Sequence, residues 1–97
     1  MAKGYWVVRV DVTDPEAFKT YQSFVGPFLA RNGGRFLVRG GQYDVPEGQA
    51  RERTVVVEFP SYEAARIAYH SADYQHAVQL RQQASIADFV IVEGYDG

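Results

Sequence analysis

The sequence contains no cysteine, and this absence excludes two kinds of chemistry. A chain of 97 residues without cysteine has neither a disulfide framework nor a thiol nucleophile. It also lacks any apolar run near the roughly 20 residues that cross a bilayer. No apolar signal segment precedes the first strand pattern. We therefore expect a cytoplasmic protein with no membrane partner.

An excess of positive charge is missing as well. The formal net charge is −2, and the 10 basic residues are scattered along the chain instead of forming a stripe. Because nucleic-acid binding needs concentrated positive potential, we expect no nucleic-acid partner. The sequence also lacks a serine-hydrolase elbow, a phosphate loop, a dinucleotide fingerprint and a paired-carboxylate pattern. It therefore leaves open whether the protein is an enzyme.

The apolar patterns that are present predict one domain over residues 1–97. Alternating and β-branched residues predict strands, and apolar residues at three- and four-residue steps predict helices. Asp14 and Ser61 precede the two helical patterns as caps. The predicted elements are a strand at Tyr5–Val12, a helix from Pro15 to about Asn32, and strands at Arg35–Gly41 and Arg53–Phe59. They continue with a helix from Tyr62 to Ala84 and a strand at Asp88–Glu93.

Both helical patterns contain a feature that predicts an irregularity. Pro27 removes a backbone donor and crowds the carbonyl four residues earlier, so it predicts a kink or a second short segment that starts near Gly26. Ser71 can cap a fresh helical turn, so the second helix is expected to bend near His70.

The order β-α-β-β-α-β is that of the ferredoxin-like fold, an α+β architecture with a four-stranded antiparallel sheet and two helices on one face. The helices leave the other face uncovered, yet the strands are apolar on both alternations. Val7, Val56 and one of the pair Val90 and Ile91 would lie on the uncovered face. We predict that a second copy covers it, in a homodimer formed through the open sheet face.

The second strand is bounded by paired glycines and carries two arginines. Gly33 and Gly34 are expected to end the preceding helix in a left-handed cap. Because side chains alternate across a strand, Arg35, Leu37 and Arg39 are expected to share one face.

Arg39 is the strongest candidate for binding a ligand. Its guanidinium group can hold a carboxylate or enolate oxygen through two parallel hydrogen bonds. The competing interpretation is internal pairing with Glu58 on the adjacent strand, since a buried arginine without a counter-charge is costly. A ligand that displaces this pair is compatible with both.

His70 and His76 are the only histidines, and a pair of histidines suggests a metal site. Their spacing of six residues places them roughly 120° apart around a continuous helix, which does not direct both at one ion. We therefore expect no metal and no cofactor. His70 alone is a candidate general base, and the alternative is a surface or capping residue.

Three tyrosines lie on helix faces directed at the sheet. Tyr21, Tyr69 and Tyr74 can donate hydrogen bonds to a small planar ligand, and the alternative is packing in the core. Tyr74 is the preferred candidate for handling a proton because it lies in the turn that begins at Ser71. Arg81, two turns later, can reach the same place.

The chain resembles a known family in segments spread over nearly its whole length. These segments are residues 14–18 with Tyr21, 33–41, 58–62, 69–71, 73–75 and 80–81. They resemble the domain of unknown function 1330, a family of the dimeric α/β-barrel superfamily. The resemblance implies two ferredoxin-like sheets that pair face to face, often with a small ligand between sheet and helices. Relatives include cofactor-free monooxygenases, small isomerases and haem enzymes. His70 stands where asparagine is more usual.

Two functions follow as hypotheses. The first is a cofactor-free enzyme or a binder of a small aromatic or carbonyl/carboxylate compound, in which Arg39 orients an oxyanion and Tyr74 or His70 handles a proton. The second is a non-catalytic structural or interaction module whose homodimer is the functional unit. The candidate ligand-binding residues of the first hypothesis are Tyr21, Arg39, Glu58, Tyr69 and Arg81.

Overall fold

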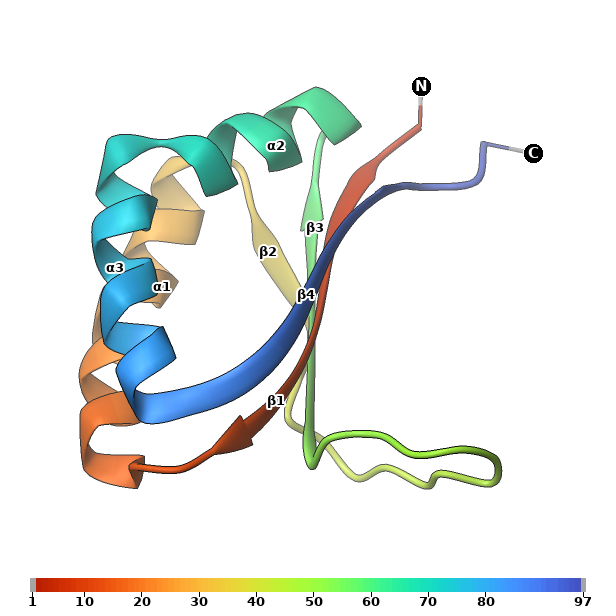
Figure 1. Ribbon diagram of the computed structural model, residues 1–97. Coiled ribbons are helices and arrows are strands. Elements are labelled where there is room, and N and C mark those ends of the chain that lie inside the picture. Colours follow the sequence, from red (N-terminus) through yellow and green to blue (C-terminus); the bar gives the residue numbers. More distant parts are fainter. Residues whose placement is uncertain (1, 97) are drawn as a thin grey trace.

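The chain forms a four-stranded sheet that three helices cover on one face (Figure 1). The computed structural model describes residues 2–96. The elements are β1 (Gly4–Val12), α1 (Pro15–Arg31), β2 (Arg35–Arg39), β3 (Arg53–Phe59), α2 (Tyr62–His70), α3 (Ala72–Ala84) and β4 (Ser85–Glu93). The strand order is β2-β3-β1-β4, and all neighbours are antiparallel. The predicted ferredoxin-like fold is confirmed.

The strand boundaries differ from the predicted ones at two places. β4 begins at Ser85, earlier than predicted, because it pairs with β1 as far as the end of that strand, where Ser85 lies opposite Val12. β2 ends at Arg39 because the next residue, Gly40, adopts a φ of +70° that a strand does not accommodate.

The N-caps of the helices are serine and aspartate residues, as the sequence indicates. The Ser71 side chain accepts a hydrogen bond from the Tyr74 amide at 3.2 Å, which ends α2 and begins α3. The predicted bend is thus a division into two helices.

The predicted division of α1 is wrong, because α1 continues through Pro27. Val25 and Phe28, on either side of this proline, are both buried, and their packing outweighs the cost of about 3 kcal/mol for proline in a helix interior.

The end of α1 follows the glycine prediction in part. Gly33 has a φ of +79° and is left-handed, whereas Gly34 is not among the residues with positive φ. The Gly34 amide donates to the Leu29 carbonyl at 2.9 Å, which satisfies an orphan acceptor in the last turn of the helix.

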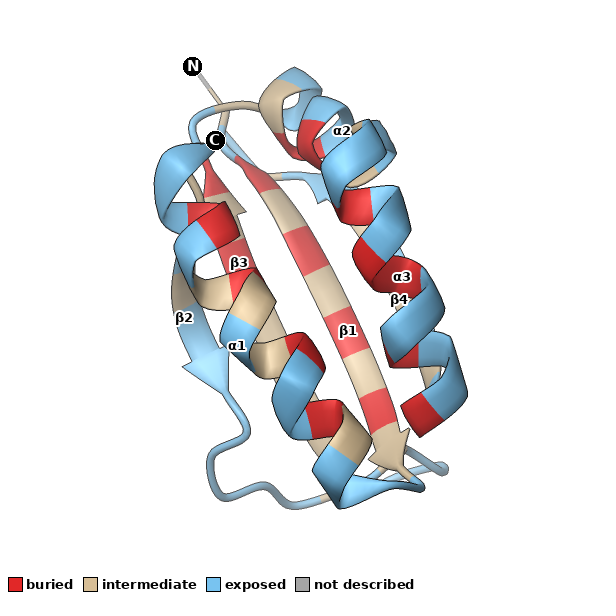
Figure 2. Cartoon of the chain, turned by 90° about the vertical axis from the view of Figure 1, so that its left-hand side faces the viewer, coloured by how far each residue is buried: buried red, intermediate tan, exposed pale blue. Residues whose placement is uncertain are grey.

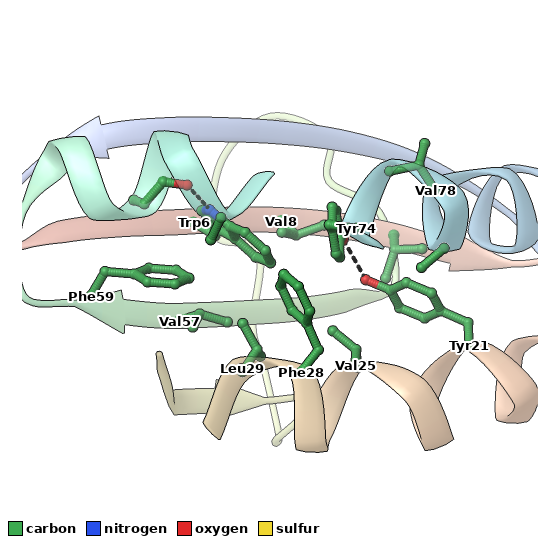
Figure 3. Close-up of a cluster of buried hydrophobic side chains, with 14 of the residues drawn as sticks. Trp6, Val8, Tyr21, Val25, Phe28, Leu29, Val57, Phe59, Tyr74 and Val78 are labelled. Atoms are coloured by element: carbon green, nitrogen blue, oxygen red, sulfur yellow. Dashed lines mark hydrogen bonds between the residues drawn. The ribbon is translucent and has the colours of Figure 1, made fainter. Parts of the chain in front are cut away.

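The hydrophobic core lies between the sheet and the helices. Buried residues alternate along β1, so that every second position faces the helices (Figure 2). Trp6 lies at the centre of this layer. Its ring centroid is 5.0 Å from that of Phe59 and 4.8 Å from that of Tyr74. Its indole nitrogen donates to the Ala65 carbonyl at 2.9 Å, which joins β1 to α2 (Figure 3).

A β-bulge interrupts the pairing of β2 with β3. The bulge lies between Phe36 and Val38, so that Leu37 is the extra residue. Residues that lie opposite each other in a ladder point to the same face of the sheet. The opposed pairs are Arg35 with Glu58 and Phe36 with Val57 before the bulge, and Val38 with Val56 and Arg39 with Val55 after it.

The bulge overturns the prediction that Arg35, Leu37 and Arg39 share one face. One extra residue reverses the alternation, so Arg39 points to the helix side while Arg35 points to the open side. The guanidinium carbon of Arg39 lies 4.2 Å from the ring centroid of Phe36, which is on the same side. The sequence pattern could not show this reversal, because the bulge depends on the pairing with β3.

The open face of the sheet is apolar along one continuous row. Val38, Val56, Val7 and Val90 lie opposite one another across all four strands. Val90 is 53% exposed in the single chain, whereas Ile91 packs on the helix side. The predicted two-sided apolarity is therefore present, with Val90 as the exposed member of its pair.

The connection between β2 and β3, residues 40–52, projects on this open side of the sheet (Figure 1). Arg51 fixes the end of the connection through ion pairs to Asp11 and Asp88, each at 3.0 Å. The Asp11 carboxylate also accepts from the Glu52 amide at 2.8 Å. These two contacts lower the pKa of Asp11, the backbone hydrogen bond most. The end of the connection is thus tied to both β1 and β4.

Replacing Trp6 tests how far the core depends on this residue. We expect Trp6→Ala to lower the free energy of unfolding by about 3–5 kcal/mol, because it empties the centre of the core. Urea unfolding followed by circular dichroism measures the change. Ile67→Ala is the control, since Ile67 is 63% exposed on α2. Equal losses in the two variants would contradict the central position of Trp6.

Candidate functional site

A narrow pocket opens between the helix-covered face of the sheet and α1. Side chains from all four strands, α1 and α3 line it, and most of them are apolar. Its cavity volume is about 40 Å³, and the space between its lining atoms is about 500 Å³ when the open mouth is included. This volume has room for a few water molecules. Arg39 is the exposed side chain among the lining residues.

The charged residues that line the pocket are three arginines, Arg39, Arg53 and Arg81. Within residues 2–96, none of the three forms an ion pair. Arg81 is only 6% exposed, and its Nε has no hydrogen-bond partner. The Nε of Arg53 is likewise buried without a partner. Since an unpaired guanidinium group is costly to bury, the pocket is electrostatically suited to an anion.

Arg81 lies above an aromatic ring at one side of the pocket. Its guanidinium carbon is 5.3 Å from the ring centroid of Phe89. A cation–π contact of this kind offsets part of the desolvation of the charge. The buried Nε of this guanidinium group keeps a donor without a hydrogen-bond partner.

Two tyrosine hydroxyls meet beside Arg81. The Tyr21 and Tyr74 oxygens are 2.6 Å apart (Figure 3). Burial raises the pKa of both phenols, and the nearby charge of Arg81 opposes this rise. Both hydroxyls are therefore protonated at neutral pH.

The direction of this hydrogen bond decides which hydrogen-bonding groups the pocket presents to a ligand. Tyr74 is fully buried behind Tyr21, whereas Tyr21 lines the pocket. When Tyr74 donates to Tyr21, the Tyr21 proton remains for a ligand. The pocket then presents only donors at this side, the Tyr21 hydroxyl and the Arg81 guanidinium group. Such a site selects an acceptor, namely a carbonyl, carboxylate or enolate oxygen.

The structure brings together only some of the residues predicted from the sequence. Tyr21, Arg39 and Arg81 line the pocket, and Tyr74 contacts it through Tyr21. Tyr69 is half-buried and packs against the ring of Phe89, with a centroid distance of 4.8 Å, without lining the pocket.

Two predicted residues lie elsewhere. Glu58 points to the open face, where it accepts from Arg35 at 3.0 Å and from Tyr5 at 3.3 Å. The predicted Arg39–Glu58 pair is wrong, because the bulge in β2 places the two side chains on opposite faces. His70 is exposed at the end of α2, beside the ring of Tyr69, and does not line the pocket.

Arg53 lines the pocket but is not among the site residues predicted from the sequence. A signal for it was present, because Arg53 shares the alternation of Val55 and Val57, the two apolar positions that face the helices. A cation at the end of such an apolar alternation is a candidate for the rim of a pocket. Gln22, which also lines the pocket, carried no comparable signal.

Residues 2–96 contain no group of three side chains able to hold a metal ion together. No helix in this range has the length and apolar character to cross a membrane.

The strand order and the one-sided helix layer define a ferredoxin-like α+β protein with the architecture of dimeric α/β barrels. The chain belongs to the family described as Domain of unknown function (DUF1330), whose model matches residues 3–95. The resemblance of the sequence segments to this family is thus confirmed. No curated protein matches the chain.

Solved structures share the fold at low sequence identity. A protein of unknown function from Rhodopseudomonas palustris is 18% identical, with a TM-score of 0.75 over 99% of this chain and 85% of that chain. SnoaB, a cofactor-independent oxygenase from Streptomyces nogalater, is 15% identical, with a TM-score of 0.66 over 100% of this chain and 97% of that chain. A putative antibiotic biosynthesis monooxygenase from Nitrosomonas europaea is 13% identical, with a TM-score of 0.58 over 99% and 94% of the two chains. Likeness at these identities establishes the fold alone.

The buried tyrosine pair predicts how stability changes at alkaline pH. Because the pKa of each phenol is raised in the folded state, the unfolded state loses these protons first, and stability falls as the pH rises above the ordinary value of 10.0. Each group contributes up to about 1.4 kcal/mol per pH unit. We expect urea unfolding between pH 8 and 11 to show this loss, and the double variant Tyr21→Phe/Tyr74→Phe to show less of it. Parallel pH profiles for the two proteins would contradict the assignment.

Proposed function

We propose that the protein binds a small planar molecule with an acceptor oxygen, a carbonyl, carboxylate or enolate, in the pocket between sheet and helices, and that it does so without a cofactor. The observation that supports this most is Arg81, a buried guanidinium without an anionic partner that lines a mostly apolar pocket. Tyr21 supplies a second donor beside it. Tyr74 acts as a positioning residue that orients the Tyr21 hydroxyl.

The arrangement of donors suits an oxyanion. In an apolar, water-poor pocket, a guanidinium group and a phenol stabilise an enolate or phenolate oxygen more than they do in water. The pocket lining within the described residues contains no histidine, aspartate or glutamate. The residues therefore favour a substrate that is already acidic and enters as its anion. A cofactor-independent oxygenase and a putative monooxygenase share the fold, which agrees with this class of reaction.

The same proposal includes a homodimer through the open sheet face. The valine row crosses all four strands, and burial of each exposed valine contributes up to about 1.5–3 kcal/mol. A two-fold axis through this face buries the same row on both copies. The second candidate function, an interaction module whose homodimer is the functional unit, rests on this row alone and predicts no response to ligands.

The ligand proposal is tested by replacing Arg81 with a residue of similar length and no charge. We expect Arg81→Met to lose at least tenfold in affinity for phenolates, enolic diketones and aromatic carboxylates, measured by calorimetry and by thermal shift. We also expect the unliganded variant to unfold with a free energy equal to or above that of the wild type, because an unpaired charge leaves the core.

Two further variants make this test decisive. Arg66→Gln is the control, because Arg66 lies exposed on α2 and pairs with Glu63. Tyr21→Phe provides an independent measurement if Arg81→Met does not fold. No binding of any of these compounds to the wild type, or unchanged binding to both pocket variants, would refute the proposal.

The homodimer is tested with two exposed apolar residues on opposite sides of the molecule. Val90 is 53% exposed on the open face and Ile67 is 63% exposed on α2. We expect sedimentation to show a dimer for the wild type and for Ile67→Asp, and a monomer for Val90→Asp at micromolar concentration. A monomeric wild type, or a Val90→Asp variant that remains dimeric, would show that the valine row is not an interface.

A further inference from the structure

We propose that the ligand is an aromatic acid that lies across the sheet, with its carboxylate at Arg39 and Arg53 and an acceptor oxygen at Tyr21 and Arg81. This inference rests on the proposed function and names the class of ligand. Its basis is that the cationic groups of the pocket stand at two separate ends of an apolar floor.

The register of the sheet shows this separation. Arg39, Val55, Val8 and Phe89 lie opposite one another on β2, β3, β1 and β4, and all four face the helices. Arg39 therefore stands at one edge of the sheet. Arg81 lies over Phe89 at the other edge. Three strand spacings separate the edges, roughly 14 Å, and the two arginine side chains reach inward from them.

The floor between the two ends is apolar. Val55 and Val8 lie between Arg39 and Phe89 in the row, and Val10 lies beside them on β1. Such a surface offers no partner to a polar group in the middle of a ligand. A flat ring with polar groups at its two opposite ends matches this arrangement, and a chain with hydroxyl groups along its length does not.

Arg53 reinforces the outer end. It faces the helix side on β3, two residues before the partner of Arg39, so the two arginines are diagonal neighbours across the strands. The guanidinium group of Arg53 packs against Gly40, where even a Cβ atom would overlap it. Gly40 also has a φ of +70°, which favours glycine. This close packing fixes the Arg53 guanidinium group on the side of the sheet that Arg39 also faces. The Nε of Arg53 is buried without a hydrogen-bond partner.

Two neighbouring guanidinium groups without a carboxylate repel each other. An anion between them removes this repulsion and satisfies N–H groups of both. Arg39 is the exposed member of the pair, so it can move aside as a ligand enters. The outer end therefore selects charge, and the inner end selects an acceptor oxygen.

A matched set of compounds separates these two requirements. 4-Hydroxybenzoate has both groups, benzoate lacks the acceptor at the far end, and methyl 4-hydroxybenzoate lacks the charge. We expect calorimetry to show that the wild type binds 4-hydroxybenzoate at least tenfold more tightly than either of the other two. Terephthalate, with a carboxylate at each end, is expected to bind at least as tightly as 4-hydroxybenzoate.

Variants assign each preference to one end of the pocket. Arg39→Gln is expected to reduce the preference for the acid over the ester at least threefold, because Arg53 remains as the second cation at this end. Tyr21→Phe is expected to reduce the preference over benzoate at least threefold. Arg66→Gln is the control and is expected to bind all four compounds as the wild type does. Arg39 is exposed, so its replacement does not disturb the core.

The outcomes distinguish this inference from the proposed function. Equal affinity for the acid and the ester in the wild type, or an acid preference that is undiminished in Arg39→Gln, would overturn the inference while the binding itself still supports the proposed function. If neither these compounds nor neutral phenols and diketones bind to the wild type, both fail. The expected pattern in the wild type and in both variants supports both.

Discussion

The bulge at Leu37 is the local feature on which the use of both faces of the sheet depends. One extra residue in β2 reverses the alternation between Phe36 and Val38. Before the bulge, Arg35 points to the open face and pairs with Glu58. After it, Arg39 points to the helix side, so the pocket acquires a cation at its mouth. Val38 turns to the open face and completes the apolar row across the four strands.

The interior combines a well-packed core with a buried polar cluster of Arg81, Tyr21 and Tyr74. Trp6 joins the sheet to α2 through its ring contacts and its hydrogen bond to Ala65. Arg81, in contrast, is buried without an anionic partner, next to two tyrosines whose pKa values burial raises. Burial of such a group costs stability unless something outside the chain compensates it. Strain or cost of this kind typically marks a functional site.

The two faces of the sheet carry different kinds of side chains. The helix face has a core with a narrow pocket that three arginines and Tyr21 help to line. The open face has a valine row and the connection of residues 40–52, which Arg51 holds by ion pairs to two strands. The pocket and the valine row therefore lie on opposite faces of the sheet.

The sequence by itself determined the elements and the fold, because caps and periodicity act between residues that are near in the chain. Asp14, Ser61 and Ser71 cap helices as expected, and the alternation in β1 identifies its buried face. Tyr21 and Arg81 were also identified as candidates for the site from their helical spacing alone.

Only the tertiary structure decided which side chains meet. The bulge depends on the pairing of β2 with β3, so alternation within β2 could not show that Arg39 and Glu58 lie on opposite faces. The continuity of α1 through Pro27 depends on core packing, which outweighs the local cost. The hydroxyls of Tyr21 and Tyr74 are 53 residues apart in the chain and 2.6 Å apart in space. Contacts of this kind depend on how the elements pack, and no pattern within one element encodes them.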